Sequence, residues 1–208
     1  MEDGLKRRWD TLAGLKITAK YAALCNELFF DFATGKEGGL EDLINESKNR
    51  KFYKCYEQIA KILEEKNVFH PIITAFYWLA NGNRKKDLPL ELTHNYIVME
   101  DGIKVFNGEK EKVVISHSSC LIMPARIKKM EEKIAIVEQP EITVKNNSFV
   151  LKKFAEKKVR RIFTDTYPSI GLISIHQGLI IEPISELQHE NLITSTQKIL
   201  DLFNGPSK

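Results

Sequence analysis

The sequence predicts an α+β fold: a helical N-terminal domain, then a small closed or nearly closed β-barrel, then a C-terminal helix. Two changes of period predict this order. Apolar residues recur about every 3.6 positions over roughly the first 80 residues, and about every second position from residue 96 to residue 184. Helical spacing returns after Ser185, which suits an N-cap. Many short strands in succession are typical of a barrel.

The helical domain is expected over residues 1–86. Its first helical pattern covers residues 5–32 and ends before glycines at positions 35, 38 and 39. Shorter helices are predicted over residues 40–44, 52–63 and 71–79, and Pro71 suits the first turn of the last one. The charged, turn-rich segment 81–89 is the candidate domain boundary.

The second domain is expected to be β-rich and to cover residues 90–208. An Asp101-Gly102 step predicts a hairpin between strands at 96–99 and 103–106. A second hairpin is expected around Glu131-Glu132. The remaining predicted strands are 113–116, 120–130, 133–137, 142–144, 149–154, 159–163, 173–176 and 179–184. A terminal helix is predicted to begin after Ser185 and to end at Gly205-Pro206.

Composition argues against several classes of protein. A formal net charge of +3 over 208 residues is too small for a dedicated nucleic-acid-binding protein. Cys25, Cys55 and Cys120 are widely spaced, so they indicate neither a disulfide framework nor a CxxC zinc site. We find no signal peptide, no apolar run long enough for a membrane helix and no common catalytic motif. The expected protein is reduced, cytoplasmic and soluble, and is not an enzyme.

Two motifs carry the functional expectation. The first is CLIMPARI at residues 120–127, in which a cysteine opens an apolar strand. The second is IGLISIHQG at residues 170–178, which contains a turn, a strand and His176. A thiolate and an imidazole brought together by a small barrel would form a two-ligand site for a metal such as ferrous iron.

From Cys120 onward the chain resembles the HypC/HupF family, small chaperones that assist the assembly of nickel–iron hydrogenases. That family carries a C-L-x-x-P-A-x-V motif and, later, a Gly-Asp turn with a strand ending in V-H-x-G. Residues 120–127 and 171–178 correspond to these two signatures. Two positions differ: Cys120 is internal rather than next to an initiator methionine, and Leu172 stands in place of the aspartate.

The resemblance implies an OB-like barrel with its terminal helix at residues 118–208, and a role as a hydrogenase maturation chaperone. Cys120, assisted by His176, would hold an iron atom that carries cyanide and carbon monoxide. The implied partners are a HypD-like scaffold protein and the hydrogenase large-subunit precursor. The residues expected to contact a partner are Leu121, Met123, Pro124, Ala125 and Gly178.

Other histidines and cysteines are assigned mainly structural roles. His117 lies three positions before Cys120 and is a weaker candidate for a group near the metal. His70 and His94 are expected to be structural, at a helix start and a strand start. Cys25 and Cys55 lie in helical patterns among apolar residues and are expected to be in the core.

Two other functions remain open at this point. The basic segment 145–161 is interpreted first as the solvated face of two strands, and alternatively as a surface for single-stranded nucleic acid on an OB-like barrel. Phe149, Phe154 and Phe163 could stack on bases or lie in the core. The third hypothesis is a structural subunit of a complex, in which Cys120 is buried and inert.

Overall fold

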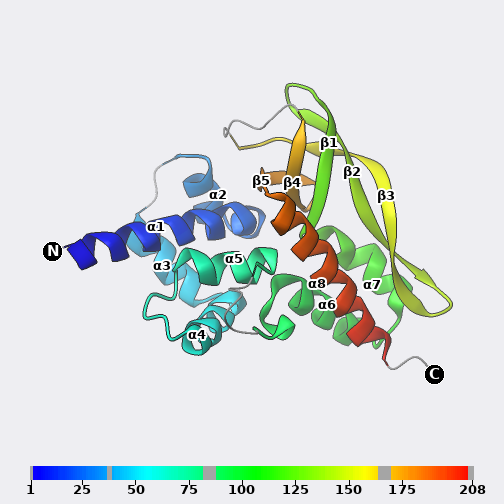
Figure 1. The fold of residues 1–208 in the computed structure, drawn as a ribbon, viewed down its shortest axis with the longest axis horizontal. Coiled ribbons are helices and arrows are strands. Elements are labelled where there is room, and N and C mark those ends of the chain that lie inside the picture. Colours follow the sequence, from blue (N-terminus) through cyan, green and yellow to red (C-terminus); the bar gives the residue numbers. More distant parts are fainter. Residues whose placement is uncertain (1, 37–38, 82–87, 164–169, 206–208) are drawn as a thin grey trace. The chain divides into compact units, whose positions relative to one another are not determined.

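The computed structural model describes residues 2–36, 39–81, 88–163 and 170–205 (Figure 1). The chain divides into two compact units, Met1–Thr93 and His94–Lys208. The division falls just after the predicted boundary segment 81–89, of which residues 82–87 lie outside the described residues. None of the described helices is both long enough and apolar enough to cross a membrane.

The first unit is helical, as predicted. Two of its helices begin at side-chain caps: Asn26 accepts a hydrogen bond from the Leu28 amide, and His70 accepts one from the Ile72 amide. His70 therefore has the structural role expected of it. The elements are α1 (Glu2–Ala22), η1 (Ala23–Cys25), α2 (Glu27–Ala33), α3 (Leu40–Lys48), α4 (Lys51–Leu63), α5 (Pro71–Leu79) and η2 (Leu90–Leu92).

An aromatic cluster forms the core of this unit. Trp78 stacks on Tyr21 with ring centroids 5.2 Å apart, and its Nε1 donates to the Tyr56 hydroxyl at 2.6 Å. Cys55 is buried, as expected for a core residue. The same expectation for Cys25 is wrong: this cysteine is exposed, because it lies in the short turn η1 rather than on an apolar helix face.

The second unit begins with helices where the sequence predicted strands. Residues 96–99 and 103–105 belong to α6 (His94–Val105), Phe106 lies in the turn that follows it, and residues 113–116 belong to α7 (Lys110–His117). Gly102 is not a hairpin residue. A Cβ at that position would lie 2.9 Å from Val113 Cγ1, so the glycine allows close packing against α7. A 3₁₀ turn, η3 (Ser118–Cys120), follows α7.

The predicted OB-like barrel is confirmed. Five strands close in the order β1-β2-β3-β5-β4, with β4 returning to β1. Neighbouring strands are antiparallel except β3 and β5, which are parallel and share the single pair Arg160↔Leu179. The strands are β1 (Met123–Met130), β2 (Ile134–Lys145), β3 (Ser148–Arg160), β4 (Gly171–His176) and β5 (Leu179–Pro183).

Strands β2 and β3 are longer than the sequence predicted, and each contains an irregularity. Gln139 pairs with Ala155 whereas Glu141 pairs with Lys152, so β3 carries one extra residue opposite Pro140. Proline has no N–H to donate to the ladder, and Phe154 takes up the extra length at φ 24°. This bulge explains why the pattern was interpreted as several shorter strands.

The terminal helix α8 (Glu186–Asn204) packs on β1, β3 and β4. The predicted N-cap is confirmed, because the Ser185 side chain accepts from the Gln188 amide while the Gln188 side chain accepts from the Ser185 amide. Within the barrel core, Phe149 and Phe163 are both about 2% exposed, whereas Phe154 is 45% exposed. Phe149 and Phe163 therefore belong to the core.

Substituting Ser185 tests how much this cap contributes. Ser185→Ala should lower the free energy of unfolding by about 1 kcal/mol, because the Gln188 amide loses its acceptor. Ser185→Asp should retain most of the stability, since aspartate caps equally well. Urea unfolding followed by circular dichroism measures both, and equal loss in the two variants would contradict a capping role.

Candidate functional site around Cys120

Cys120 is the last residue of η3 and is partly exposed. The antiparallel pairing of β1 with β4, in which Met123 faces Ile175, brings the two sequence motifs together. The backbone N–H of Gln177 donates to the Ser119 carbonyl at 2.8 Å. The side-chain Nε2 of Gln177 lies 3.8 Å from Cys120 Sγ. The turn after β4 is therefore hydrogen-bonded directly to the turn that contains Cys120.

The backbone of the β4–β5 turn explains the H-x-G sequence. Gln177 has φ 53° and Gly178 has φ 74°, so two successive residues adopt the left-handed conformation of a tight hairpin turn. Glycine occupies the second position without steric cost. This turn directs the Gln177 side chain toward the Cys120 sulfur.

His176 lies at the end of β4 and is only 3% exposed. Its ring packs against the ring of His94, with centroids 5.1 Å apart and planes at 86°. His94 Nε2 in turn lies 2.9 Å from the Cys120 carbonyl oxygen. Because a carbonyl only accepts, Nε2 is the donor in this bond. His176 is thus linked to the backbone of Cys120 through His94.

Asn95 holds the residue that leads from η3 into β1. Its Oδ1 accepts from the Ile122 amide at 2.8 Å, and its Nδ2 donates to the Ile122 carbonyl at 2.9 Å. Nδ2 also lies 3.2 Å from the Thr196 hydroxyl of α8. Ile122 is fully buried, so its backbone N–H and C=O cannot bond to water. The Asn95 side chain supplies the hydrogen bonds that a neighbouring strand would otherwise make.

His94 is kept neutral by its surroundings. Burial, and secondarily the nearby His176, lower the pKa of His94 to about 3, while the hydrogen bond to the Cys120 carbonyl opposes the shift. A neutral imidazole with its proton on Nε2 can donate to that carbonyl at any ordinary pH.

The remaining candidates occupy different positions. The sequence assigned His94 only a structural role, and gave no role to Asn95 or Gln177. His117 lies beside Phe106, with ring centroids 5.8 Å apart, and its Nδ1 is 2.7 Å from the Ser116 hydroxyl. No contact of the His117 ring with Cys120 is among those of the described residues.

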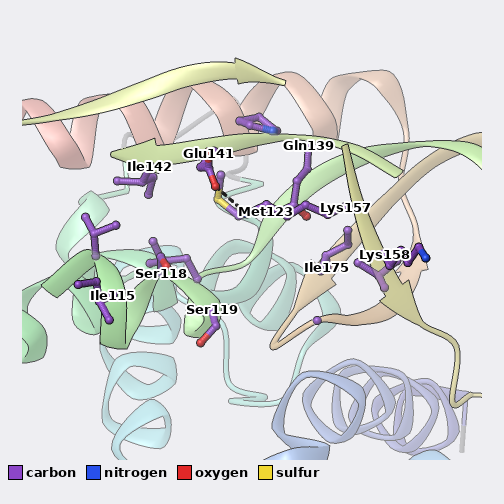
Figure 2. A pocket seen from close by; sticks show the side chains of 15 residues that line it. Ile115, Ser118, Ser119, Met123, Gln139, Glu141, Ile142, Lys157, Lys158 and Ile175 are labelled. Atoms are coloured by element: carbon purple, nitrogen blue, oxygen red, sulfur yellow. Dashed lines mark ion pairs between the residues drawn. The ribbon is translucent and has the colours of Figure 1, made fainter. Parts of the chain in front are cut away.

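Four of the expected partner-binding residues lie in the first part of β1 or, in the case of Leu121, just before it. Leu121, Met123, Pro124 and Ala125 are buried, whereas Gly178 is exposed. Leu121, Met123 and Gly178 line a pocket of about 300 Å³ beside η3 (Figure 2). The motif residues therefore shape the surroundings of Cys120 more than they present side chains to solvent.

The chain offers few metal ligands at this place. Over residues 2–36, 39–81, 88–163 and 170–205, no group of three or more histidine, cysteine, aspartate or glutamate side chains could hold a metal ion.

Comparisons of the chain with protein-family models, with curated proteins and with solved structures found no match.

Removing the Asn95 side chain should loosen the segment that carries Cys120. In Asn95→Ala the buried amide and carbonyl of Ile122 lose their partners, and the free energy of unfolding should fall by roughly 2–4 kcal/mol. Asn95→Asp keeps an acceptor for the Ile122 amide but loses the donor, so its loss should be intermediate. Denaturant unfolding ranks the three proteins, and an alanine variant as stable as the parent would contradict this role.

His94 should make stability depend on pH. Its folded pKa of about 3 lies below the unfolded value near 6.5, so below pH 6.5 only the unfolded state readily gains the proton. Stability should fall by up to about 1.4 kcal/mol per pH unit from pH 6.5 towards pH 3, with no contribution above pH 6.5. His94→Gln should flatten this part of the profile, as measured by denaturant unfolding at a series of pH values.

Proposed function

We propose that this chain is an assembly protein for nickel–iron hydrogenase, in which Cys120 carries an iron atom that bears cyanide and carbon monoxide. The observation that supports the proposal most directly is the position of Cys120. Cys120 is a partly exposed residue, lies in the turn that leads into the barrel, and is adjacent to the turn that ends the second motif.

The small number of protein ligands suits a carrier. A thiolate is a strong donor to iron, and binding releases its proton. With one thiolate from the protein, the other coordination positions remain available for diatomic ligands and for groups of a partner. Transfer then requires one iron–sulfur bond to break, after which the thiolate regains a proton.

His176 and His94 would act as positioning residues rather than as iron ligands. His176 is 3% exposed and packs edge to face with His94, whose Nε2 donates to the Cys120 carbonyl. This chain of contacts fixes the backbone of Cys120 and leaves its sulfur as the protein ligand. The partners in the proposal are a HypD-like scaffold protein and the hydrogenase large-subunit precursor.

The nucleic-acid hypothesis has less support. Phe149 and Phe163 are in the core, so they are not available to stack on bases. Lysines of the barrel also face acidic partners: Lys128 lies 3.0 Å from Glu138, and Lys157 lies 3.2 Å from Glu141. A surface of mixed charge is a poor match for a phosphate backbone.

Iron carriage can be tested by infrared spectroscopy. The chain would be purified without oxygen from a host that expresses the hydrogenase maturation proteins, including the scaffold protein in excess. The expected spectrum has stretching bands of iron-bound cyanide and carbon monoxide, and these should disappear in Cys120→Ala. Cys25→Ala is the matched control, because Cys25 is exposed but lies in the helical unit, and its bands should equal those of the parent.

Two results would contradict the proposal. One is a spectrum of the parent chain without these bands although the scaffold protein carries them. The other is a Cys120→Ala variant that retains the bands at full intensity while remaining folded by circular dichroism.

A further inference from the structure

The pocket beside η3 contains a buried side-chain amide that the rest of the chain does not use. Gln139 of β2 is 8% exposed, and its Oε1 is buried and accepts no hydrogen bond from the described residues. No hydrogen bond from its Nε2 is among those of the described residues either. Figure 2 shows the Gln139 side chain extending from β2 among the residues that line the pocket. An unpaired buried amide is unfavourable, so a bound molecule that pairs with it would stabilise this site.

Two other side-chain amides of this unit show what such a group binds. Asn95 accepts from the backbone N–H of Ile122 and donates to the backbone C=O of the same residue. Asn204 of α8 makes the same two hydrogen bonds with Phe149. In each case one amide pairs with the backbone of one residue, as a residue of an adjacent antiparallel strand would. Gln139 carries the same donor and acceptor on a side chain that is one methylene longer.

The rest of the lining is mainly apolar. Helix α7 and turn η3 form one wall, and strands β1 to β4 form the others (Figure 2). Such a lining favours an aliphatic side chain. Ile115 on α7 borders the pocket and is 83% exposed, so apolar surface continues beyond the opening, which favours a polypeptide over a small free molecule. The apolar lining residues are Val114, Ile115, Leu121, Met123, Ile142, Val159 and Ile175.

The pocket offers no unpaired charge to a ligand. Among its lining residues, all of which the structure describes, the charged ones are Glu141, Lys157 and Lys158. Glu141 and Lys157 lie 3.2 Å apart and neutralise each other. Lys158 follows Lys157 on β3, and its ammonium points to the outer face, away from the pocket (Figure 2). A charged group buried here would lose water without gaining a counter-ion, so we expect an uncharged occupant.

We propose that this pocket binds an internal residue of a partner polypeptide, one with an aliphatic side chain in an extended segment. The side chain of that residue fits the apolar lining, its backbone N–H donates to Gln139 Oε1, and its C=O accepts from Gln139 Nε2. The terminal torsion of glutamine is broad and Oε1 has no hydrogen bond to break, so the amide can turn to meet the ligand. A volume of about 300 Å³ is at the lower end for ligand sites and suits one such residue.

The local fold supports a binding role for this part of the barrel. Pro140 and the bulge at Phe154 interrupt the β2–β3 ladder next to Gln139, and bulges occur preferentially beside binding sites. Turn η3 and Gly178 also line the pocket, so a ligand in it would lie beside the turn that contains Cys120. The proposal does not depend on iron carriage, because the pocket lining includes neither Cys120 nor His176.

The test uses the full chain without iron and the uncharged probe N-acetyl-leucine N-methylamide, which has one leucine side chain with both of its backbone groups. Amide shifts in proton–nitrogen correlation spectra should change at residues of the pocket, with a dissociation constant on the order of 1 mM. The same probe with a methyl group on the leucine nitrogen should bind about tenfold more weakly, because it cannot donate to Gln139 Oε1. N-acetyl-leucine with a free carboxylate should also bind more weakly than the uncharged probe, because no unpaired cation lines the pocket.

One substitution then identifies the amide. Gln139→Met should bind the uncharged probe about tenfold more weakly, because the side chain keeps its length but loses the donor and the acceptor. It should melt no lower than the parent, since the lost groups have no partner in the free protein. Gln197→Met is the matched control and should bind as the parent does, because Gln197 lies on α8, donates to Asp201 at the surface and does not line the pocket.

Any of three results would overturn the proposal. No shift change at pocket residues, at probe concentrations well above the expected dissociation constant, would show that water alone satisfies the amide. Equal binding by the parent and a folded Gln139→Met variant would show that the probe does not pair with this side chain. Tighter binding of the free carboxylate would show that the site selects a charged ligand. All three results leave the infrared test of iron carriage unaffected, so the two proposals can fail independently.

Discussion

The pair of hydrogen bonds between the Asn95 side chain and the backbone of Ile122 connects the helical start of the second unit to its barrel. Ile122 follows Cys120 by two residues and precedes β1 by one, so its placement determines both where the thiol lies and where the strand begins. Both of its backbone groups are buried, and both bonds come from one amide, at 2.8 and 2.9 Å. Because the same amide reaches Thr196, helix α8 is part of this arrangement.

The same pair of hydrogen bonds occurs at the C-terminal end of α8. Asn204 Oδ1 accepts from the Phe149 amide at 2.7 Å, and Asn204 Nδ2 donates to the Phe149 carbonyl at 2.9 Å. In both places a side-chain amide pairs with a residue at the start of a strand or just before it. Asparagine suits this role because its donor and acceptor lie side by side, as they do on a strand edge. The helices of this unit thus supply hydrogen bonds as well as apolar contact.

The sequence predicted elements well where one face of each is buried against a single core. Helix α5 has the predicted bounds, and the barrel, β4 and the capped α8 follow from alternation and from Ser185. Residues 96–116 were predicted wrongly because short apolar runs beside Asp101-Gly102 fit either a helix or a strand. The close packing of Gly102 against Val113 of α7 favours the helix, and that contact is not visible in the sequence.

For the candidate site, the residues within the two motifs could be predicted, whereas the residues that hold them in place could not. Cys120 and His176 stand in local motifs, and the pairing of β1 with β4 brings those motifs together. The contribution of Asn95 depends on a contact with a residue 27 positions later in the chain, and no local pattern indicates such a contact. Cys25 shows the converse: its neighbours are apolar, yet a break between two helices leaves it exposed.

The strand pairs of the barrel differ greatly in length. Strands β3 and β5 share one residue pair in parallel, whereas β2 and β3 pair along most of their length. Cooperative opening requires least free energy where the fewest ladder bonds must break. The Arg160 amide donates to the Gly178 carbonyl at 2.9 Å, so the weakest seam of the barrel ends in the same turn that holds Gln177 beside the Cys120 sulfur. An opening of that seam would therefore act on a residue, Gly178, that directly follows the residue hydrogen-bonded to the turn of the thiol.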